Sequence, residues 1–283
     1  MDAPYAILEP LRPGIARLLA RNPSPYTYTG TQTYLVGDEE EVVVIDPGPD
    51  LDEHLDAIVV AVGSRSLKAI SCTHTHRDHS PASRPLKERT GAPIIGCAPL
   101  VLDDDGPRAD ASFDADYAPD RVLGDGEALA VDGHDLVAVA TPGHTSNHLC
   151  FAYRGALFTG DHVMGWSTTV VIPPDGDMGA YMRSLGKMAD REEDEVYFPA
   201  HGAQVDNPRR LARHLLGHRM AREKQIMKRL EEGDSTIDAI VANIYPGLDE
   251  RLVPAAGGSV LAHLIELDRQ GRASQHGEEW RVA

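Results

Sequence analysis

The chain has few residues of three kinds, and each shortage argues against a class of protein. Three cysteines among 283 residues are too few for a disulfide-stapled domain, so they are predicted to be reduced core residues. Aromatic residues make up only 5% of the chain, which argues against extended surfaces for stacking nucleic-acid bases. Basic residues are outnumbered, 27 against 44 acidic ones, and the resulting net charge of -17 argues against nucleic acid as the default partner.

Long apolar runs and a secretory start are missing as well. No window approaches the roughly 20 apolar residues of a membrane span, so no membrane partner is expected. Residues 1–5 lack the basic and then apolar pattern of a signal peptide. The sequence therefore predicts a cytoplasmic protein. Its hydrophobic fraction of 42% is enough to bury a core.

The acidic excess lies in the first part of the chain, where the secondary-structure pattern is of the α/β class. Residues 1–204 hold 15 basic and 32 acidic residues, whereas residues 205–283 hold 12 of each. Amphipathic helices are expected at 52–62 and 178–189. Short β-branched runs predict strands at 34–36, 42–45, 67–72, 136–140, 149–153, 156–159 and 195–198. We expect one α/β domain over residues 1–205.

Residues 206–283 have helical periodicity instead. A long helix at 208–232 is expected to carry Leu216, Met220, Met227 and Leu230 on one face. A second helix follows, for which Asp234 and Ser235 are candidate caps. A third helix is expected to stop at Gly271, and a hairpin is expected at 272–282. The sequence predicts a small helical second domain.

The most informative segment is Thr-His-Thr-His-Arg-Asp-His-Ser at 73–80, where a predicted strand gives way to a loop. In extended chain His74 and His76 point the same way, so they can share one metal ion. Asp78 and His79 follow once the chain bends, and they can face a second ion. Neutral imidazole and carboxylate are the ligands that zinc prefers in catalytic sites. The alternative is a group of polar side chains on a solvated loop.

Three later residues complete this set, and each follows a predicted strand beside glycine or proline. They are His144 after Pro142-Gly143, Asp161 after Gly160, and His201 after Pro199-Ala200. Taken singly, each is more often a loop residue without a role. Taken together, they supply the ligands that two ions would still lack.

The order His74-x-His76-x-Asp78-His79, then His144, Asp161 and His201, resembles the metallo-β-lactamase superfamily. The resemblance implies an αββα sandwich with two divalent ions at one edge, most commonly Zn²⁺, with Fe or Mn as alternatives. It implies that His74, His76 and His144 hold one ion, that Asp78, His79 and His201 hold the other, and that Asp161 bridges them. Asp46 matches a carboxylate that orients the ligand loop, although an aspartate before Pro-Gly also suits a simple turn.

A narrower resemblance is to the lactamase-beta-like subfamily, whose mitochondrial member is a single-strand-specific endoribonuclease. Residues 22–37 and segments of the tail carry it, and the tail implies a winged-helix-like domain after residue 205. The chain departs from that pattern at Gln32, where asparagine is usual, and at Pro81-Ala82, where two glycines are usual. His148, four residues after His144, is a candidate for the substrate cleft.

The expected reaction is hydrolysis by a metal-bridging hydroxide, with Asp78 also orienting that nucleophile. Single-stranded RNA is the favoured substrate, on the resemblance alone. A thioester, a lactone or a β-lactam acted on promiscuously is the alternative. A second alternative is a binding protein for nucleic acid or a partner, because the 208–232 helix is rich in arginine. Arg213, Arg219 and Arg222 are the candidate phosphate contacts on that helix.

Overall fold

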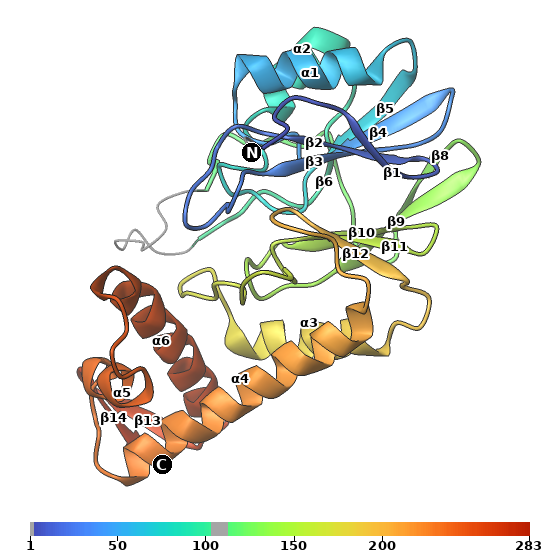
Figure 1. Cartoon of the computed structure of the whole chain (residues 1–283). Helices are drawn as coiled ribbons and strands as arrows, with labels where there is room; N and C mark the ends of the chain where they lie inside the picture. Colours follow the sequence, from blue (N-terminus) through green and yellow to red (C-terminus); the bar gives the residue numbers. More distant parts are fainter. Residues whose placement is uncertain (1–2, 103–112) are drawn as a thin grey trace.

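A computed structural model describes residues 3–102 and 113–283 of the chain. It contains two five-stranded sheets stacked face to face, each with helices on its outer side (Figure 1). This four-layer arrangement confirms the expected αββα sandwich. Within the described residues, no helix is both long enough and apolar enough to cross a membrane.

The first sheet has the strand order β1-β2-β3-β4-β5, and helices α1 and α2 cover its outer face (Figure 1). Its β3–β4 hairpin and the parallel pairing of β4 with β5 follow the expected strands. The sequence did not predict β1 and β2, which form the edge of this sheet. The elements are β1 (Glu9–Arg12), β2 (Ile15–Leu19), β3 (Gln32–Val36), β4 (Glu41–Ile45), α1 (Asp52–Val62), β5 (Ser66–Ser71) and α2 (Ser83–Thr90).

The second sheet has the strand order β12-β11-β10-β9-β8, and helices α3 and α4 cover its outer face (Figure 1). β11 and β12 are parallel, and the other pairs are antiparallel. Two short strands, β6 and β7, form a separate pair. The elements are β6 (Ile95–Gly96), β7 (Arg121–Val122), β8 (Ala128–Val131), β9 (His134–Ala140), β10 (Leu149–Tyr153), β11 (Ala156–Gly160), α3 (Met178–Asp190), β12 (Val196–Pro199) and α4 (Pro208–Glu231).

The C-terminal part is a small helical unit with a hairpin, as expected. Thr236, and not Asp234 or Ser235, caps α5, because its side chain accepts a hydrogen bond from the Ala239 amide. The elements are α5 (Ile237–Ile244), the 3₁₀-helix η1 (Glu250–Leu252), α6 (Val253–Arg269), β13 (Ala273–His276) and β14 (Glu279–Val282).

Helix α4 belongs to two hydrophobic cores. Its N-terminal half places Ala212 and Leu215 in the core beneath the second sheet, where α3 also contributes. Its C-terminal half places Ile226 and Leu230 in the core of the C-terminal unit. The expected apolar face was partly wrong, because Met220 is 48% exposed. The two halves of α4 pack against different cores, so the buried face of the helix changes along its length. A single apolar stripe with helical periodicity therefore does not predict which residues are buried.

Candidate metal centre

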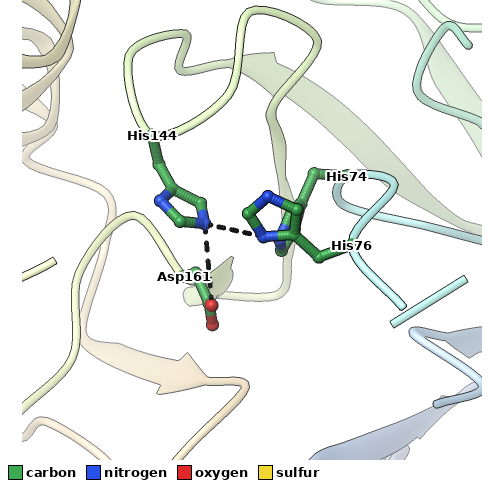
Figure 2. Close-up of side chains that lie close together, drawn as sticks. All are labelled: His74, His76, His144 and Asp161. Carbon is green, nitrogen blue, oxygen red and sulfur yellow. Dashed lines mark hydrogen bonds and ion pairs between the residues drawn. The ribbon is translucent and has the colours of Figure 1, made fainter. Parts of the chain in front are cut away.

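The seven histidines and aspartates singled out in the sequence converge at one edge of the sandwich. They follow β5, β9, β11 and β12, whose ends meet there. Two groups form, and within each group the candidate donor atoms lie within 4.8 Å of one another. The first group is His74, His76, His144 and Asp161, drawn in Figure 2, and the second is Asp78, His79 and His201.

Hydrogen bonds behind the first group fix which ring nitrogens face inward. Thr73 Oγ1 donates to Asp46 Oδ2 at 2.8 Å, so it accepts from His74 Nδ1 at 3.0 Å and leaves His74 Nε2 without a proton. His144 Nδ1 donates to the Val170 carbonyl at 2.6 Å, which also leaves its Nε2 without a proton. Backing of this kind is how proteins orient metal-binding imidazoles.

Three ring nitrogens of the first group therefore meet at short range. His76 Nδ1 lies 3.0 Å from His74 Nε2 and 3.2 Å from His144 Nε2, as Figure 2 shows for the second pair. One proton on His76 can satisfy only one of the two lone pairs that face it. A divalent cation would satisfy all three nitrogens at once, so the donor set fits a metal ion.

The second group is backed in the same manner. His79 Nδ1 donates to Asp46 Oδ2 at 3.0 Å, and His201 Nδ1 donates to the Gly30 carbonyl at 3.2 Å. The Nε2 atoms of both rings and Asp161 Oδ1 are buried and form no hydrogen bond among the described residues, although they lie within ion-pair distance of one another. Buried polar atoms without hydrogen bonds are rare in proteins, so three that converge in one place also fit a bound cation.

Asp161 faces both groups. Its Oδ1 lies 3.2 Å from His201 Nε2 and 3.6 Å from His79 Nε2, while its Oδ2 lies 3.7 Å from His144 Nε2. Asp78 Oδ2 lies 3.2 Å from His201 Nε2. Each oxygen of the Asp161 carboxylate is therefore turned toward a different donor group.

Asp46 connects the two groups from behind. Its carboxylate accepts hydrogen bonds from the Thr73 amide at 2.7 Å, the Thr73 hydroxyl and the His79 ring. The residue is 2% exposed, and its backbone is left-handed, with φ of 49°. Aspartate tolerates this conformation better than most residues, so the turn before Pro47-Gly48 also aims the carboxylate at the ligand loop.

His74 and His76 of the first group are neutral imidazoles. Burial lowers the pKa of His74 well below its usual value, and the neighbouring His79, His76 and His144 lower it further. Burial and His144 lower the pKa of His76 to about 3. Neutral rings are the form that binds metal, so this group is ready to coordinate at neutral pH.

In the second group the histidine pKa is shifted in the opposite direction when no metal is bound. Burial lowers the pKa of His201, but Asp161 and Asp78 outweigh it and raise that pKa to about 10. Burial raises the pKa of Asp161, but the positive charge on His201 and His79 outweighs it and holds the pKa well below its usual range. Without a cation these residues are ion pairs, so a metal must displace protons from the two histidines.

Two glycines allow the ligands to reach this edge. Gly160, directly before Asp161, has φ of 50°, and a Cβ there would lie 2.6 Å from Thr73 Oγ1. Gly143, directly before His144, has φ of 138°, and a Cβ there would lie 2.3 Å from the Tyr181 backbone. Any side chain at either position would push a ligand-bearing turn away from the site.

Two expected positions differ from the structure. His148 is 1% exposed and stacks on His74 with ring centroids 5.2 Å apart, so it lies buried behind His74 and not on a cleft wall. Arg219 is only 4% exposed, and it donates to the Thr169 carbonyl instead of facing solvent. The expected cationic face of α4 is therefore smaller, and Arg229 on that helix is already paired with Asp234 at 2.6 Å.

Sequence reasoning missed the segment 164–171, which lies beside the metal centre. Val170 backs His144, and Thr169 Oγ1 donates to the Asp161 carbonyl at 2.8 Å. Trp166 stacks on Tyr28 with centroids 5.0 Å apart. No periodicity marks such a loop, and the clustering of exposed aromatic residues is visible only in three dimensions.

The αββα sandwich and the histidine-aspartate edge define a metal-binding hydrolase fold. Residues 26–201 match the family described as the metallo-beta-lactamase superfamily, and residues 236–280 match the beta-lactamase associated winged helix domain. The chain belongs to the metallo-β-lactamase superfamily and is a hydrolytic enzyme with a C-terminal winged-helix domain.

Relatives of known description cover most of the chain. It is 34% identical over 244 residues to a beta-lactamase-like protein 2 homolog of Caenorhabditis elegans, and this match covers 83% of the chain and 77% of the relative. It is 32% identical over 260 residues to an atrochrysone carboxyl ACP thioesterase of Aspergillus chevalieri, and this match covers 87% of the chain and 78% of the relative. A beta-lactamase domain protein from Burkholderia ambifaria has the same fold, with a TM-score of 0.80, 19% identity, and coverage of 99% and 94%.

Proposed function

We propose that the chain is a dinuclear metal-dependent hydrolase. His74, His76 and His144 would hold one divalent ion, and Asp78, His79 and His201 the other. The carboxylate of Asp161 carries this proposal, because its two oxygens face different donor groups at 3.2 and 3.7 Å. Zn²⁺ suits a set rich in neutral imidazole, and Fe or Mn can use the same ligands.

When bound, divalent cations at these residues would supply an activated water as nucleophile and would polarise the bond to be cleaved. The side chain of Asp78 is 26% exposed, against 13% for Asp161 and none for His79. Asp78 is therefore the carboxylate that borders both the donor group and the opening. We propose that it accepts a hydrogen bond from the attacking water and holds that water in line with the substrate.

Single-stranded RNA is our first candidate substrate. The resemblance of residues 22–37 to the lactamase-beta-like subfamily supports it. The similarity to the beta-lactamase-like protein 2 homologs of Caenorhabditis elegans and Drosophila melanogaster supports that subfamily assignment. In-line displacement at phosphorus is a reaction for which paired cations are well suited, because they can contact both attacking and leaving oxygens.

A thioester is the second candidate. The observation that favours it is the similarity to several fungal proteins described as atrochrysone carboxyl ACP thioesterases, at 30–32% identity. The same nucleophile could attack a carbonyl carbon, with the thiolate as leaving group.

The test combines metal analysis with a two-substrate panel on the full chain. We expect two ions per chain by elemental analysis after zinc loading, and cleavage of a fluorescent single-stranded oligoribonucleotide that Asp161→Asn abolishes. Cleavage of an aryl-acyl thioester without RNA cleavage would overturn the first candidate in favour of the second. No more than one tight ion, with neither substrate cleaved, would overturn the dinuclear hydrolase.

A further inference from the structure

A cleft lies between segment 164–171 and the C-terminal domain. Its volume is about 330 Å³, within the range of small-ligand pockets. Segment 164–171 forms one wall. His218, Arg219 and Arg222 of α4, Tyr245 after α5, and Ser259 of α6 contribute to the other.

The charge in this cleft is opposite to that of the whole chain. Its lining includes two arginines and a histidine but no aspartate or glutamate, in a protein of net charge -17. Elsewhere on α4 arginines have acidic partners, such as Arg209 with Glu192 at 3.8 Å. Among the described residues neither Arg219 nor Arg222 forms a salt bridge. A buried guanidinium without a carboxylate is costly, so an anion from outside would stabilise it.

Hydrogen-bond donors in the cleft are also unused. Arg219 donates to the Thr169 carbonyl at 2.5 Å and to Ser259 Oγ at 3.5 Å, yet its Nε is buried without a partner among the described residues. The guanidinium of Arg222 stacks 4.1 Å from the Tyr245 ring centroid, and its Nε is likewise without a partner. Stacking leaves the edge of a guanidinium free to donate, and that edge matches the oxygens of a carboxylate or phosphate.

The few exposed aromatic residues gather at the same place. Tyr26, Tyr28 and Trp166 are 64%, 52% and 36% exposed, whereas every other tyrosine, phenylalanine and tryptophan is buried or half-buried. Tyr26 and Trp166 line the cleft, and Tyr28 stacks on Trp166. A planar, largely apolar group next to an anion would find a complementary surface here.

The cleft adjoins the metal centre through two short connections. Val170, on the cleft wall, accepts the hydrogen bond of His144, and Thr169 donates to the Asp161 carbonyl. We propose that the cleft is an anion-binding subsite, in which Arg222, supported by Arg219 and His218, binds a carboxylate or phosphate of a substrate whose scissile bond lies at the metals. That the cleft binds an anion does not depend on the proposed function. That this anion belongs to the substrate does rest on the proposed function.

Arginine supplies the charge of this subsite. Burial lowers the pKa of His218, and Arg219 and Arg222 lower it further, so His218 is a neutral hydrogen-bonding group at pH 7. Arg222 is half-buried and lies at the cleft wall, whereas Arg219 is 4% exposed and already bonded to Thr169. The arginine to test is therefore Arg222.

The experiment measures equilibrium binding of two matched probe pairs to the zinc-loaded full chain by calorimetry. One pair is adenosine 5′-monophosphate and adenosine, and the other is 2-naphthoate and 2-naphthamide. Each pair compares an anion with a neutral analogue of the same ring. The variants are Arg222→Gln and, as the matched control, Arg210→Gln, an exposed arginine on the same helix that does not line the cleft.

We expect at least one anion to bind about ten-fold more tightly than its neutral analogue, a preference that Arg222→Gln removes and Arg210→Gln retains. Preference for the phosphate alone would assign the subsite to a nucleotide, and preference for the carboxylate alone to an organic acid. Equal binding of anion and neutral analogue, or a preference that survives Arg222→Gln because the metals hold the anion, would overturn the proposal. Failure to cleave RNA or thioester would overturn the proposed function but would leave these binding results unaffected.

Discussion

The metal centre and the interdomain cleft are neighbours that are built in opposite ways. At the metal centre, histidines and aspartates come from loops after strands, and backing hydrogen bonds hold rings such as His79 and His144 in one orientation. In the cleft, cationic side chains come from a helix, and several of their donors have no partner among the described residues. The first site is rigid and complementary to cations, and the second is complementary to anions.

This contrast separates chemistry from selectivity. The proposed dinuclear centre would suit many substrates, because two bound cations would supply both nucleophile and electrophile. A neighbouring anion site can then decide which molecule is held long enough to react. The four predictions below test the two regions in turn, from the largest expected effect to the smallest.

Loss of Asp78 should affect turnover far more than folding. We expect Asp78→Ala to lower kcat by about 10³-fold or more, because in the proposed mechanism this one residue would both bind metal and position the water. Steady-state kinetics with metal content measured on the same sample will check this. Asp116→Ala, at an aspartate with a 79% exposed side chain, is the control and should leave kcat unchanged. Near-wild-type turnover of Asp78→Ala on every active substrate would contradict the assigned mechanism.

Loss of the Asp46 carboxylate should weaken metal binding. Asp46→Asn keeps the shape but gives up an acceptor oxygen, so we expect metal affinity to fall about 10–100-fold in chelator competition. Asp132 is a matched control, since it also has a left-handed backbone and accepts hydrogen bonds from two amides, of Asp38 and Glu41. If Asp46→Asn and Asp132→Asn bound metal alike, the supporting role of Asp46 would be rejected.

Loss of Arg219 should loosen the contact between the two domains. We expect Arg219→Met to lower the free energy of unfolding by about 2 kcal/mol in urea titration, because the Thr169 carbonyl loses a buried charged donor. Arg210→Met, at an exposed arginine two and a half turns earlier, should cost less than about 0.5 kcal/mol. Equal costs for the two variants would show that burial of Arg219 contributes nothing.

Acid should destabilise the C-terminal domain through His263. Burial lowers its pKa from 6.5 to about 3, and Arg219, Arg222 and His218 contribute. Below pH 6.5 the unfolded chain takes up a proton that the folded chain refuses, so stability falls by about 1.4 kcal/mol per pH unit until about pH 3. Other buried histidines such as His76 add to the total slope, so urea titrations from pH 7 to pH 4 should show a slope in wild type and in His214→Phe that is steeper than in His263→Phe by about this amount. An unchanged slope in His263→Phe would exclude His263 as the titrating group.

The convergence of the seven candidate ligands could be predicted from the sequence, because it depends on local order along the chain. The spacing of His74, His76, Asp78 and His79 is a short-range signal. His144, Asp161 and His201 each follow a strand next to glycine or proline, and the ends of neighbouring strands in a sheet meet. The structure brings all seven together as that reasoning expected.

The edge strands and the cleft could not be predicted in the same way. Strand β1 alternates half-buried and exposed residues, Glu9 and Leu11 against Pro10 and Arg12, so hydrophobicity does not mark it. Arg219 lies among basic residues on α4. Helical periodicity alone does not show that segment 164–171 packs against that face of the helix. Only the tertiary fold shows that it is buried.

The length of α4 has a consequence for how this enzyme can change. The helix runs for 24 residues and connects the two domains without a loop. Each residue of an α-helix adds about 1.5 Å and about 100° of rotation. Inserting or deleting one residue between Leu215 and Arg222 would therefore swing the C-terminal domain around the helix axis and carry Arg222 out of the cleft. New selectivity can arise by exchanging side chains in the cleft, whereas changes in the length of this segment would dismantle it.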